Sequence, residues 1–409
     1  MRIAAIIAEY DPFHHGHLYL VNKARRSGAD HVIAIMSGSF MQRGGPAAFP
    51  VRLRTEMALC QGVDLVLEIP SYACCQSAEV FAQASVAILD SLGIIDDLYF
   101  GCEDDSFELL DGIADMLVHE TDPFKMALKQ SLKEGLSFPA ARSKALMTVM
   151  KDPAVSQILS RPNNILAIEY LKALKKTESR IRPVPVLRVG DAYHDIRISS
   201  EGPASATAIR TLLKHLKPEE IMTVEALPKS SRQLIAGHLA CEGMITRSDF
   251  SEIAMYGLFQ QQEHLEDYCD MTGSLSNRIR AMLPSYRNIE DFVMQVYSKN
   301  IAASAVWRSL FNVLLEHRKD IFDQWRDDHY QGYVNVLGLN KRILPLLSSV
   351  PEPVRKTMII RPRDLDNLNE TCAALAVSDQ KADLLYSQMR MLRFGRAERK
   401  QYLKTIFYP

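Results

Sequence analysis

Short apolar runs alternate with amphipathic segments over the first half of the chain. The apolar runs fall at residues 3–8, 31–36, 63–69, 97–100 and 184–187. The helix-like segments between and after them include 17–27, 50–61, 77–92 and 205–216. Continuous apolar strands separated by helices are typical of a parallel sheet with helices on both faces. We therefore expect an α/β domain over residues 1–235, with a mostly helical insertion at about 121–180.

The pattern changes after about residue 235. Strand-like runs disappear, and amphipathic segments such as 290–298, 301–317 and 379–394 dominate. Apolar residues at three- and four-residue spacing are typical of helices that bury one face. Residues 236–409 are therefore expected to form a mostly α-helical C-terminal domain.

The composition of the chain indicates the cellular compartment. The 409 residues are 47% hydrophobic, which suffices for sizeable cores. No apolar run approaches the roughly 18 residues of a membrane span, and no basic segment and apolar core of a secretory signal precede the first strand. Seven cysteines without a Cys-x-x-Cys pair indicate reduced thiols. These features predict a cytoplasmic protein with no membrane partner.

The loop after the first apolar run carries the strongest chemical signal. It reads Glu9-Tyr10-Asp11-Pro12-Phe13-His14-His15-Gly16-His17. Such a loop is where an open α/β sheet binds a nucleotide, and a glycine at the start of a helix lets a phosphate approach the backbone N–H groups. His14 and His17 share one helical face and can donate hydrogen bonds or charge as pyrophosphate leaves. The alternatives are a zinc site and merely polar loop residues; no Asp, Glu or Cys follows at a spacing that would complete a zinc site, so we expect no metal ligands.

A second motif lies before a later helix. It reads Gly202-Pro203-Ala204-Ser205-Ala206-Thr207-Ala208-Ile209-Arg210. Ser205 suits a helix N-cap, and the forked guanidinium of Arg210 can reach the β- or γ-phosphate of a nucleotide. Taken alone, without the first motif, Arg210 would be interpreted as a solvated helix arginine.

The two motifs resemble the paired signatures of the HIGH-motif nucleotidyltransferase superfamily. Further segments narrow the resemblance; they lie at 36–44, 62–70, 99–103, 161–170 and 188–195. In this order, over essentially the whole chain, the pattern resembles the bacterial tRNA(Met) cytidine acetate ligase family. Asp11 and His15 depart from it, because asparagine is expected at both positions, and Ala206 stands where serine is commoner.

That resemblance implies a Rossmann-like nucleotidyltransferase domain followed by a helical domain that binds tRNA. It implies an enzyme that activates acetate with ATP as acetyl-adenylate, releases pyrophosphate, and acetylates N4 of the wobble cytidine of elongator tRNA(Met). ATP with Mg²⁺ is then a substrate, and neither a tightly bound cofactor nor DNA is expected. The implied catalytic residues are His14, His17 and Arg210. The implied ATP site is Ile7, Ala8, Glu9, Tyr10, Asp11, Pro12, Phe13, His14, His15, Gly16, His17, Leu18, Tyr19, Leu20, Gly101, Asn163, Arg188, Ser205 and Thr207.

The formal net charge of −1 requires that any RNA site be a local concentration of cations. The last thirty residues offer one, because cations recur at mostly three- or four-residue steps among aromatic residues. The predicted tRNA-binding residues there are Arg390, Arg393, Arg396, Arg399 and Lys400. A solvated helix face over an apolar stripe fits the same pattern, and the loop 42–45 is an alternative phosphate site.

Two other functions stay open at this stage. A stand-alone adenylyltransferase of cofactor biosynthesis shares both motifs but leaves the helical C-terminal half unexplained. A non-catalytic RNA-binding protein that retains the fold is the second. The base for acyl transfer is also open, with Glu9, Asp11, Glu103 and Asp191 as candidates near the motif loops.

Overall fold

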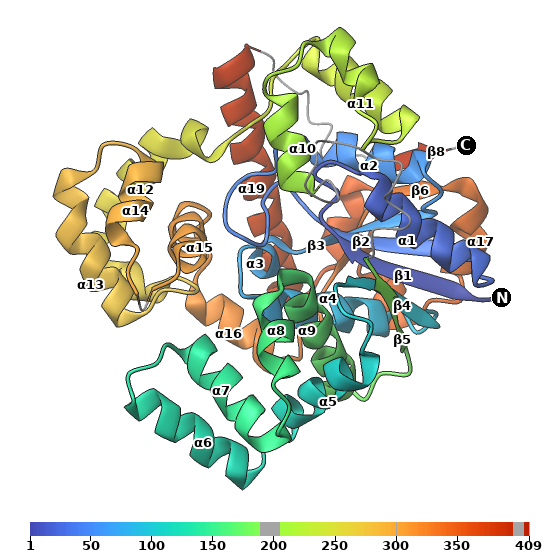
Figure 1. Ribbon diagram of the computed structural model, residues 1–409. Coiled ribbons are helices and arrows are strands. Elements are labelled where there is room, and N and C mark those ends of the chain that lie inside the picture. Colours follow the sequence, from blue (N-terminus) through green and yellow to red (C-terminus); the bar gives the residue numbers. More distant parts are fainter. Residues whose placement is uncertain (189–204, 300, 396–404, 409) are drawn as a thin grey trace.

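The computed structural model describes residues 1–188, 205–299, 301–395 and 405–408. Within them, one eight-stranded sheet runs through the molecule in the order β5-β4-β1-β2-β3-β6-β7, with β8 also paired to β6 (Figure 1). The strands are β1 (Ile3–Ala8), β2 (His31–Ser37), β3 (Leu65–Ile69), β4 (Asp97–Cys102), β5 (Arg182–Leu187), β6 (Val334–Asn340), β7 (Met358–Ile359) and β8 (Ile406–Tyr408). Strands β1 to β5 are parallel, and β6 is antiparallel to β3.

Alternation along the buried strands sends side chains to two separate cores. In β1, Ile3, Ala5 and Ile7 join one core, and Ala4 and Ile6 join the other. Because side chains of a strand point to opposite faces in turn, a strand that is apolar throughout must be covered on both sides. The apolar runs of the sequence therefore predicted a sheet between two helical layers, and the structure confirms this fold class.

Helices α1 (His15–Arg26), α2 (Val51–Cys60), α10 (Ala206–Leu213) and α11 (Lys229–Leu239) cover one face. The other face is covered by α4 (Ala78–Ser91), α5 (Phe107–Val118), α9 (Pro162–Lys176) and the beginning of α19 (Glu370–Phe394), next to the short α3 (Ser71–Cys74). Between α5 and α9 the chain forms α6 (Asp122–Lys133) and α7 (Phe138–Met150), which project at the bottom of Figure 1, and α8 (Ala154–Ser160), which lies beside α9.

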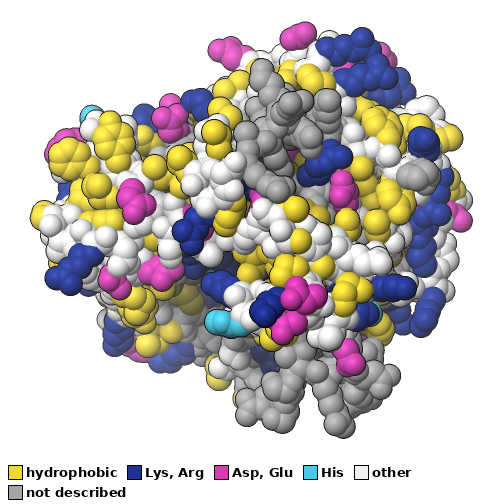
Figure 2. Space-filling model, turned by 90° about the horizontal axis from the view of Figure 1, so that it is seen from above, with side chains coloured by type: hydrophobic (Ala, Val, Ile, Leu, Met, Phe, Trp, Pro, Cys, Tyr) yellow, Lys and Arg dark blue, Asp and Glu magenta, His cyan; other side chains and the backbone are white. Residues whose placement is uncertain are grey.

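A helical lobe lies beside the sheet. It consists of α12 (Ser251–Gln261), α13 (Gly273–Met282), α14 (Ile289–Val296) and α15 (Ala303–Leu314), and has its own apolar core, which Phe40 and Tyr386 join from the body of the molecule. Helix α16 (Lys319–Asp327) leads from the lobe back to the sheet. Seen from above, the surface is hollowed between the lobe and the body, and Lys and Arg side chains lie along the hollow (Figure 2).

The expectation that strands end before residue 235 is wrong. Strands β6, β7 and β8 join the sheet from the C-terminal half of the chain. The short helices α17 (Leu344–Leu347) and α18 (Glu352–Lys356) lie between β6 and β7 in the chain. The run Val334–Asn340 is interrupted by Asn335 and Gly338, so its apolar signal is weaker than that of β1 or β2. The division of the chain into two domains near residue 235 stays a prediction, although β6 and α19 pack on the N-terminal sheet. No helix in the described parts of the chain is long and apolar enough to cross a membrane.

Candidate nucleotide-binding site

The strand order places the first motif at the point where the sheet changes direction. From β1 the chain continues to β2 on one side, and β4 is inserted later on the other side of β1. The connections from two such neighbours leave on opposite faces, which opens a crevice at the carboxyl ends of the strands. The loop 9–14 after β1 and the loop after β4 both border this crevice.

The histidines of the first motif cap the helix that they begin. The Nδ1 atom of His14 accepts the N–H of Gly16 at 3.0 Å, and the Nδ1 atom of His17 accepts the N–H of His14 at 3.3 Å. The two rings stack with centroids 3.8 Å apart. Since each Nδ1 is an acceptor, the proton of each neutral ring resides on Nε2, which becomes a hydrogen-bond donor.

Burial also fixes the charge of these rings. It lowers the pKa of His14 to about 3, with the nearby Arg188 contributing, and it lowers the pKa of His17 well below its usual value. Both histidines are therefore neutral at pH 7. This geometry favours donation of hydrogen bonds to a phosphate and leaves the positive charge to arginine.

The second motif supplies that arginine. Ser205 caps α10 by accepting the N–H of Ala208 at 3.2 Å, which confirms the predicted helix start. One turn on, Arg210 donates to the main-chain carbonyl of Asp11 and, at 3.1 Å, to the hydroxyl of Thr207. The two motifs, almost 200 residues apart, thus meet at one place. The carboxylate of Asp11 accepts the N–H groups of Ala48 and Phe49 at 3.0 and 3.1 Å, so it holds the loop and is no free base.

The ends of β4 and β5 form the opposite wall. A Cβ at Gly101 would lie 2.9 Å from Cδ of Arg188, so glycine is what lets the arginine cross the strand. Asn163, at the start of α9, donates to the carboxylate of Glu103. The neighbouring Asn164 is completely buried; it accepts the N–H of Glu103 and donates to Asp104, both at 2.7 Å. Asn164 is a structural residue that the sequence interpretation passed over.

The remaining predicted residues line or support the same loop. Tyr10 and Phe13 are buried against the ring of His17, with centroids 4.9 and 5.5 Å away. The N–H of His15 donates to the carbonyl of Ala226 at 3.0 Å. The others are buried or half-buried: Ile7 and Ala8 at the end of β1, Glu9 and Pro12 in the loop, and Gly16, Leu18, Tyr19 and Leu20 in α1.

A buried arginine that the sequence did not reveal fixes the loops after β1 and β2. Arg54 in α2 is 0% exposed. It donates to the main-chain carbonyls of Phe49 (3.0 Å), Glu9 (2.8 Å), Ser37 (2.9 Å) and Gly38. The only sequence signal was an arginine in an otherwise apolar helix face, which usually indicates an exposed residue.

The predicted RNA-binding helix is only partly exposed. Arg390 is 4% exposed and pairs with Glu242, with Nη2 at 2.5 Å and Nε at 3.1 Å from Oε2. Its guanidinium lies inside the protein, so the geometry does not support the tRNA contact proposed for it. Arg393 is exposed, and its Nε lies 3.3 Å from Oδ1 of Asp249. Arg396, Arg399, Lys400 and the candidate base Asp191 lie outside the described residues.

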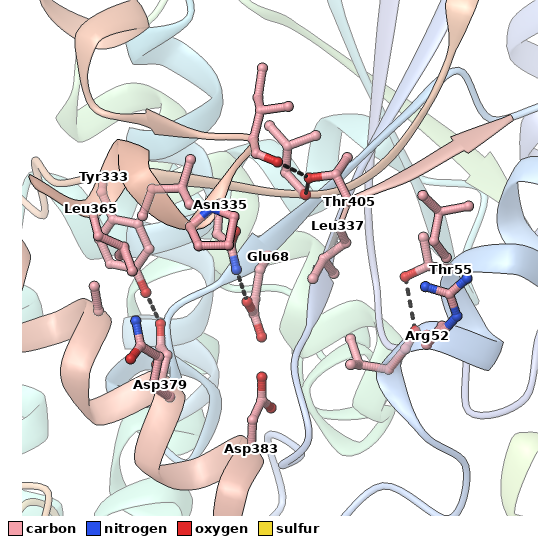
Figure 3. A pocket seen from close by; sticks show the side chains of 18 residues that line it. Arg52, Thr55, Glu68, Tyr333, Asn335, Leu337, Leu365, Asp379, Asp383 and Thr405 are labelled. Atoms are coloured by element: carbon pink, nitrogen blue, oxygen red, sulfur yellow. Dashed lines mark hydrogen bonds between the residues drawn. The ribbon is translucent and has the colours of Figure 1, made fainter. Parts of the chain in front are cut away.

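A separate cavity of about 40 Å³ lies between β3, β6 and α19. Glu68 and Asp383 point toward each other in it, Glu68 accepts a hydrogen bond from Asn335, and Asp379 accepts one from Tyr333 (Figure 3). This volume holds about one water molecule, so the cavity is too small for a nucleotide. Among the described residues no group of three or more His, Cys, Asp or Glu has the arrangement of a metal site.

The fold and the paired motifs define a nucleotidyltransferase of the HIGH type. The profile of the family described as HIGH Nucleotidyl Transferase matches residues 1–401. A tRNA(Met) cytidine acetate ligase of Caldicellulosiruptor saccharolyticus is 38% identical over 357 residues, which are 87% of this chain and 86% of the relative. One of Fervidobacterium nodosum is 34% identical over 418 residues and covers 100% of this chain and 95% of the relative.

Solved structures agree. The crystal structure of Thermotoga maritima TmcAL bound with alpha-thio ATP superimposes with a TM-score of 0.88 at 27% identity, over 100% of both chains. The apo form of that protein matches equally well. The chain belongs to the tRNA(Met) cytidine acetate ligase family.

Proposed function

We propose that this chain is an ATP-dependent ligase that joins acetate to N4 of the wobble cytidine of elongator tRNA(Met), through acetyl-adenylate. The observation that carries the proposal is the meeting of His14, His17 and Arg210 at the switch point of the sheet. It is supported by relatives named tRNA(Met) cytidine acetate ligase over most of their length and by a relative solved with an ATP analogue.

In the first step a carboxylate oxygen of acetate attacks the α-phosphorus of ATP, and pyrophosphate leaves. Negative charge builds on the phosphate oxygens during this exchange, and fixed donors stabilise it. We assign this role to the Nε2–H groups of His14 and His17 and to Arg210. Arg210 binds the β- and γ-phosphates. The opposite wall of the same crevice is formed by Gly101, Asn163 and Arg188. We assign these residues to the binding of the nucleoside part of ATP. Mg²⁺ accompanies ATP, held mainly by phosphate and water oxygens.

In the second step the N4 amine attacks the carbonyl carbon of acetyl-adenylate. AMP leaves with the electrons of the anhydride bond, and loss of one proton from N4 completes the amide. The lone pair of this amine is delocalised into the ring, so holding it against the carbonyl carries much of the rate. A protein that acts on tRNA in this way works in the cytoplasm.

The test is acetate-dependent release of pyrophosphate from ATP, measured with and without tRNA, in two variants of one residue. In His17→Asn the amide oxygen retains the acceptor that caps α1, but no group replaces Nε2–H. In His17→Gln the side-chain amide places an N–H donor near the position of the histidine Nε2, but the acceptor for the N–H of His14 is lost. We expect His17→Asn to fold normally and to lose about 10²- to 10³-fold in rate, as when one oxyanion donor is removed.

The control is His264→Asn, an exposed histidine in the helical lobe. It should release pyrophosphate at the wild-type rate. Wild-type rates in His17→Asn would refute the assigned role of Nε2–H, and release that is independent of acetate in the wild type would refute the reaction.

A further inference from the structure

The loop after β2 is clamped against the helical lobe by one arginine. Arg247, in the turn before α12, donates through Nε to the carbonyl of Gly44 at 2.8 Å and through Nη2 to that of Arg43 at 3.1 Å. Its guanidinium carbon lies 4.3 Å from the centroid of the Trp307 ring. Gly44 has φ +73°, and a Cβ there would lie 2.5 Å from the main-chain nitrogen of Arg308. The position of Arg247 is therefore fixed before any ligand binds.

Two of the three arginines at this seam form no ion pair with a described carboxylate, although Glu290 is near enough to favour the charged form of Arg247. Arg308 has a carboxylate partner, because its Nε lies 2.6 Å from Asp270. Arg43 is exposed, and among the residues that the structure describes neither Arg43 nor Arg247 has a carboxylate within ion-pair distance. Two of the five N–H donors of Arg247 are used by the carbonyls of the loop. The rest are available to an oxygen-rich anion.

The pKa of Arg247 reflects the charged groups around it. Burial lowers the pKa of Arg247 to about 10; Arg210 and Arg43 contribute in the same direction, and Glu290 and Cys75 oppose them. Arg210 in turn contacts Asp11 in the loop of the first motif. Positive charge thus extends from Arg210 at the nucleotide site to Arg247 at the edge of the lobe. Clefts with charge of one sign concentrate ligands of the other sign.

We propose that Arg43 and Arg247 form a phosphate-binding site at this seam, and that its occupant is a backbone phosphate of the RNA whose cytidine receives the acetyl group. The proposal rests on the proposed function, because the RNA acceptor comes from it. Arg43 reaches from the nucleotidyltransferase side and Arg247 from the lobe, so the pair binds a strand that crosses the hollow. The triphosphate of ATP carries the same chemistry and is the other source of a phosphate here.

The test measures the affinity for tRNA(Met) over a series of salt concentrations, together with the KM for ATP, in Arg43→Gln and Arg247→Gln. Each variant should bind tRNA about ten-fold more weakly, the loss expected for a charge-assisted hydrogen bond. The slope of log affinity against log salt should fall by about 1, as for one lost phosphate contact. The KM for ATP should stay unchanged.

Three further measurements keep the result clear. Lys129→Gln removes one exposed charge on α6, at the opposite end of the molecule, and should leave both quantities unchanged. The side chain of Arg43 is exposed and forms no hydrogen bond or ion pair with the described residues, so Arg43→Gln should keep the wild-type unfolding midpoint even if Arg247→Gln loosens the seam. Arg247→Lys keeps the charge but not the clamp, and should fall between wild type and Arg247→Gln.

A raised KM for ATP with unchanged tRNA affinity would assign the phosphate site to the triphosphate and overturn the RNA assignment. Unchanged values of both in the two variants would overturn the site itself. The binding measurement needs no catalysis, so it is independent of the acetate reaction. If the wild-type protein forms acetyl-adenylate but does not bind tRNA(Met), the proposal falls while the first step of the proposed function stands.

Discussion

At the scale of single residues, the site depends on side chains that hold backbone as much as on those that face the nucleotide. His14 and His17 each use Nδ1 to cap α1 and thereby turn Nε2–H toward the ligand side. Asp11, which departs from the family pattern, accepts two main-chain N–H groups as well as lying 3.5 Å from Arg210. One loop is thus oriented entirely by its own side chains and those of its neighbours.

Arg54 gives the clearest prediction at this scale. Replacement by methionine, which keeps much of the volume, leaves the buried carbonyls of Glu9, Ser37, Gly38 and Phe49 without donors. Each hydrogen bond to a charged donor contributes about 1.5–3 kcal/mol, so we expect the free energy of unfolding to fall by about 3 kcal/mol or more. Denaturant unfolding measures it. Arg52→Met, two residues earlier on the exposed side of α2, is the control and should change stability little. A loss below 1 kcal/mol in Arg54→Met would contradict the assigned role.

The same residues show what a sequence can reveal. His14, Gly16, His17 and Arg210 were found because their spacing carries chemistry. Arg54 and Asn164 were missed because a buried polar residue is recognisable only through its partners, which come from other parts of the chain. Arg390 shows the converse: a cation at helical spacing was read as solvent-facing, but Glu242 on a distant segment buries it.

At the scale of elements, strands β1 to β3 could be predicted because each is buried and apolar on both faces, and β4 and β5 because each contains a short apolar run. Strand β6 could not, because it lies beyond the parallel strands, with Asn335 facing Glu68 and Gly338 under α2. Helix α1 was expected to begin near Gly16, and it begins at His15 with His14 as its N-cap. Local patterns thus predict elements with regular burial, whereas an antiparallel addition from a distant segment depends on tertiary contacts.

The side chain of Arg188 passes over Gly101 of β4, and this contact gives a prediction at this scale. In Gly101→Ala the new methyl group would lie 2.9 and 3.1 Å from Cδ and Cγ of Arg188, which is a flexible side chain and can move. We expect little change in stability and about a ten-fold higher KM for ATP, since one charge-assisted contact is displaced. Gly237→Ala, where a Cβ would have no heavy atom of the described residues within 4 Å, is the matched control. An unchanged KM in Gly101→Ala would exclude a role of Arg188 in ATP binding.

At the scale of the whole molecule, α19 connects the C-terminal end of the chain to the sheet. Asp379 accepts the N–H of Ser71 at 2.6 Å and the hydroxyl of Tyr333, and Asp383 accepts the hydroxyl of Ser39 at 2.5 Å. Glu68 of β3 completes the group of carboxylates (Figure 3). The helix that carries part of the predicted RNA-binding surface is thus anchored by buried carboxyl groups, and burial raises the pKa of Glu68 and of Asp379.

This anchor makes stability depend on pH. Burial raises the pKa of Asp379 to about 7, and Asp383 adds to the effect. A carboxyl group whose pKa is raised on folding stabilises the protein fully below its unfolded pKa and loses that contribution as the pH rises to about 7. Asparagine cannot ionise, so the free energy of unfolding of Asp379→Asn relative to wild type should rise between pH 5 and pH 8, by roughly 1–3 kcal/mol. Asp320→Asn, at a 76% exposed side chain, should show no such trend. A pH-independent difference for Asp379→Asn would contradict the raised pKa of Asp379.

The central claim is that this molecule transfers acetate to a tRNA cytidine at the site built by His14, His17 and Arg210. The most direct measurement is mass spectrometry of nucleosides from elongator tRNA(Met) incubated with the protein, ATP, Mg²⁺ and isotopically labelled acetate. We predict labelled N4-acetylcytidine that requires ATP and is lost in His17→Asn. Unmodified tRNA, with ATP still cleaved to pyrophosphate, would contradict the claim and direct the search to another acceptor.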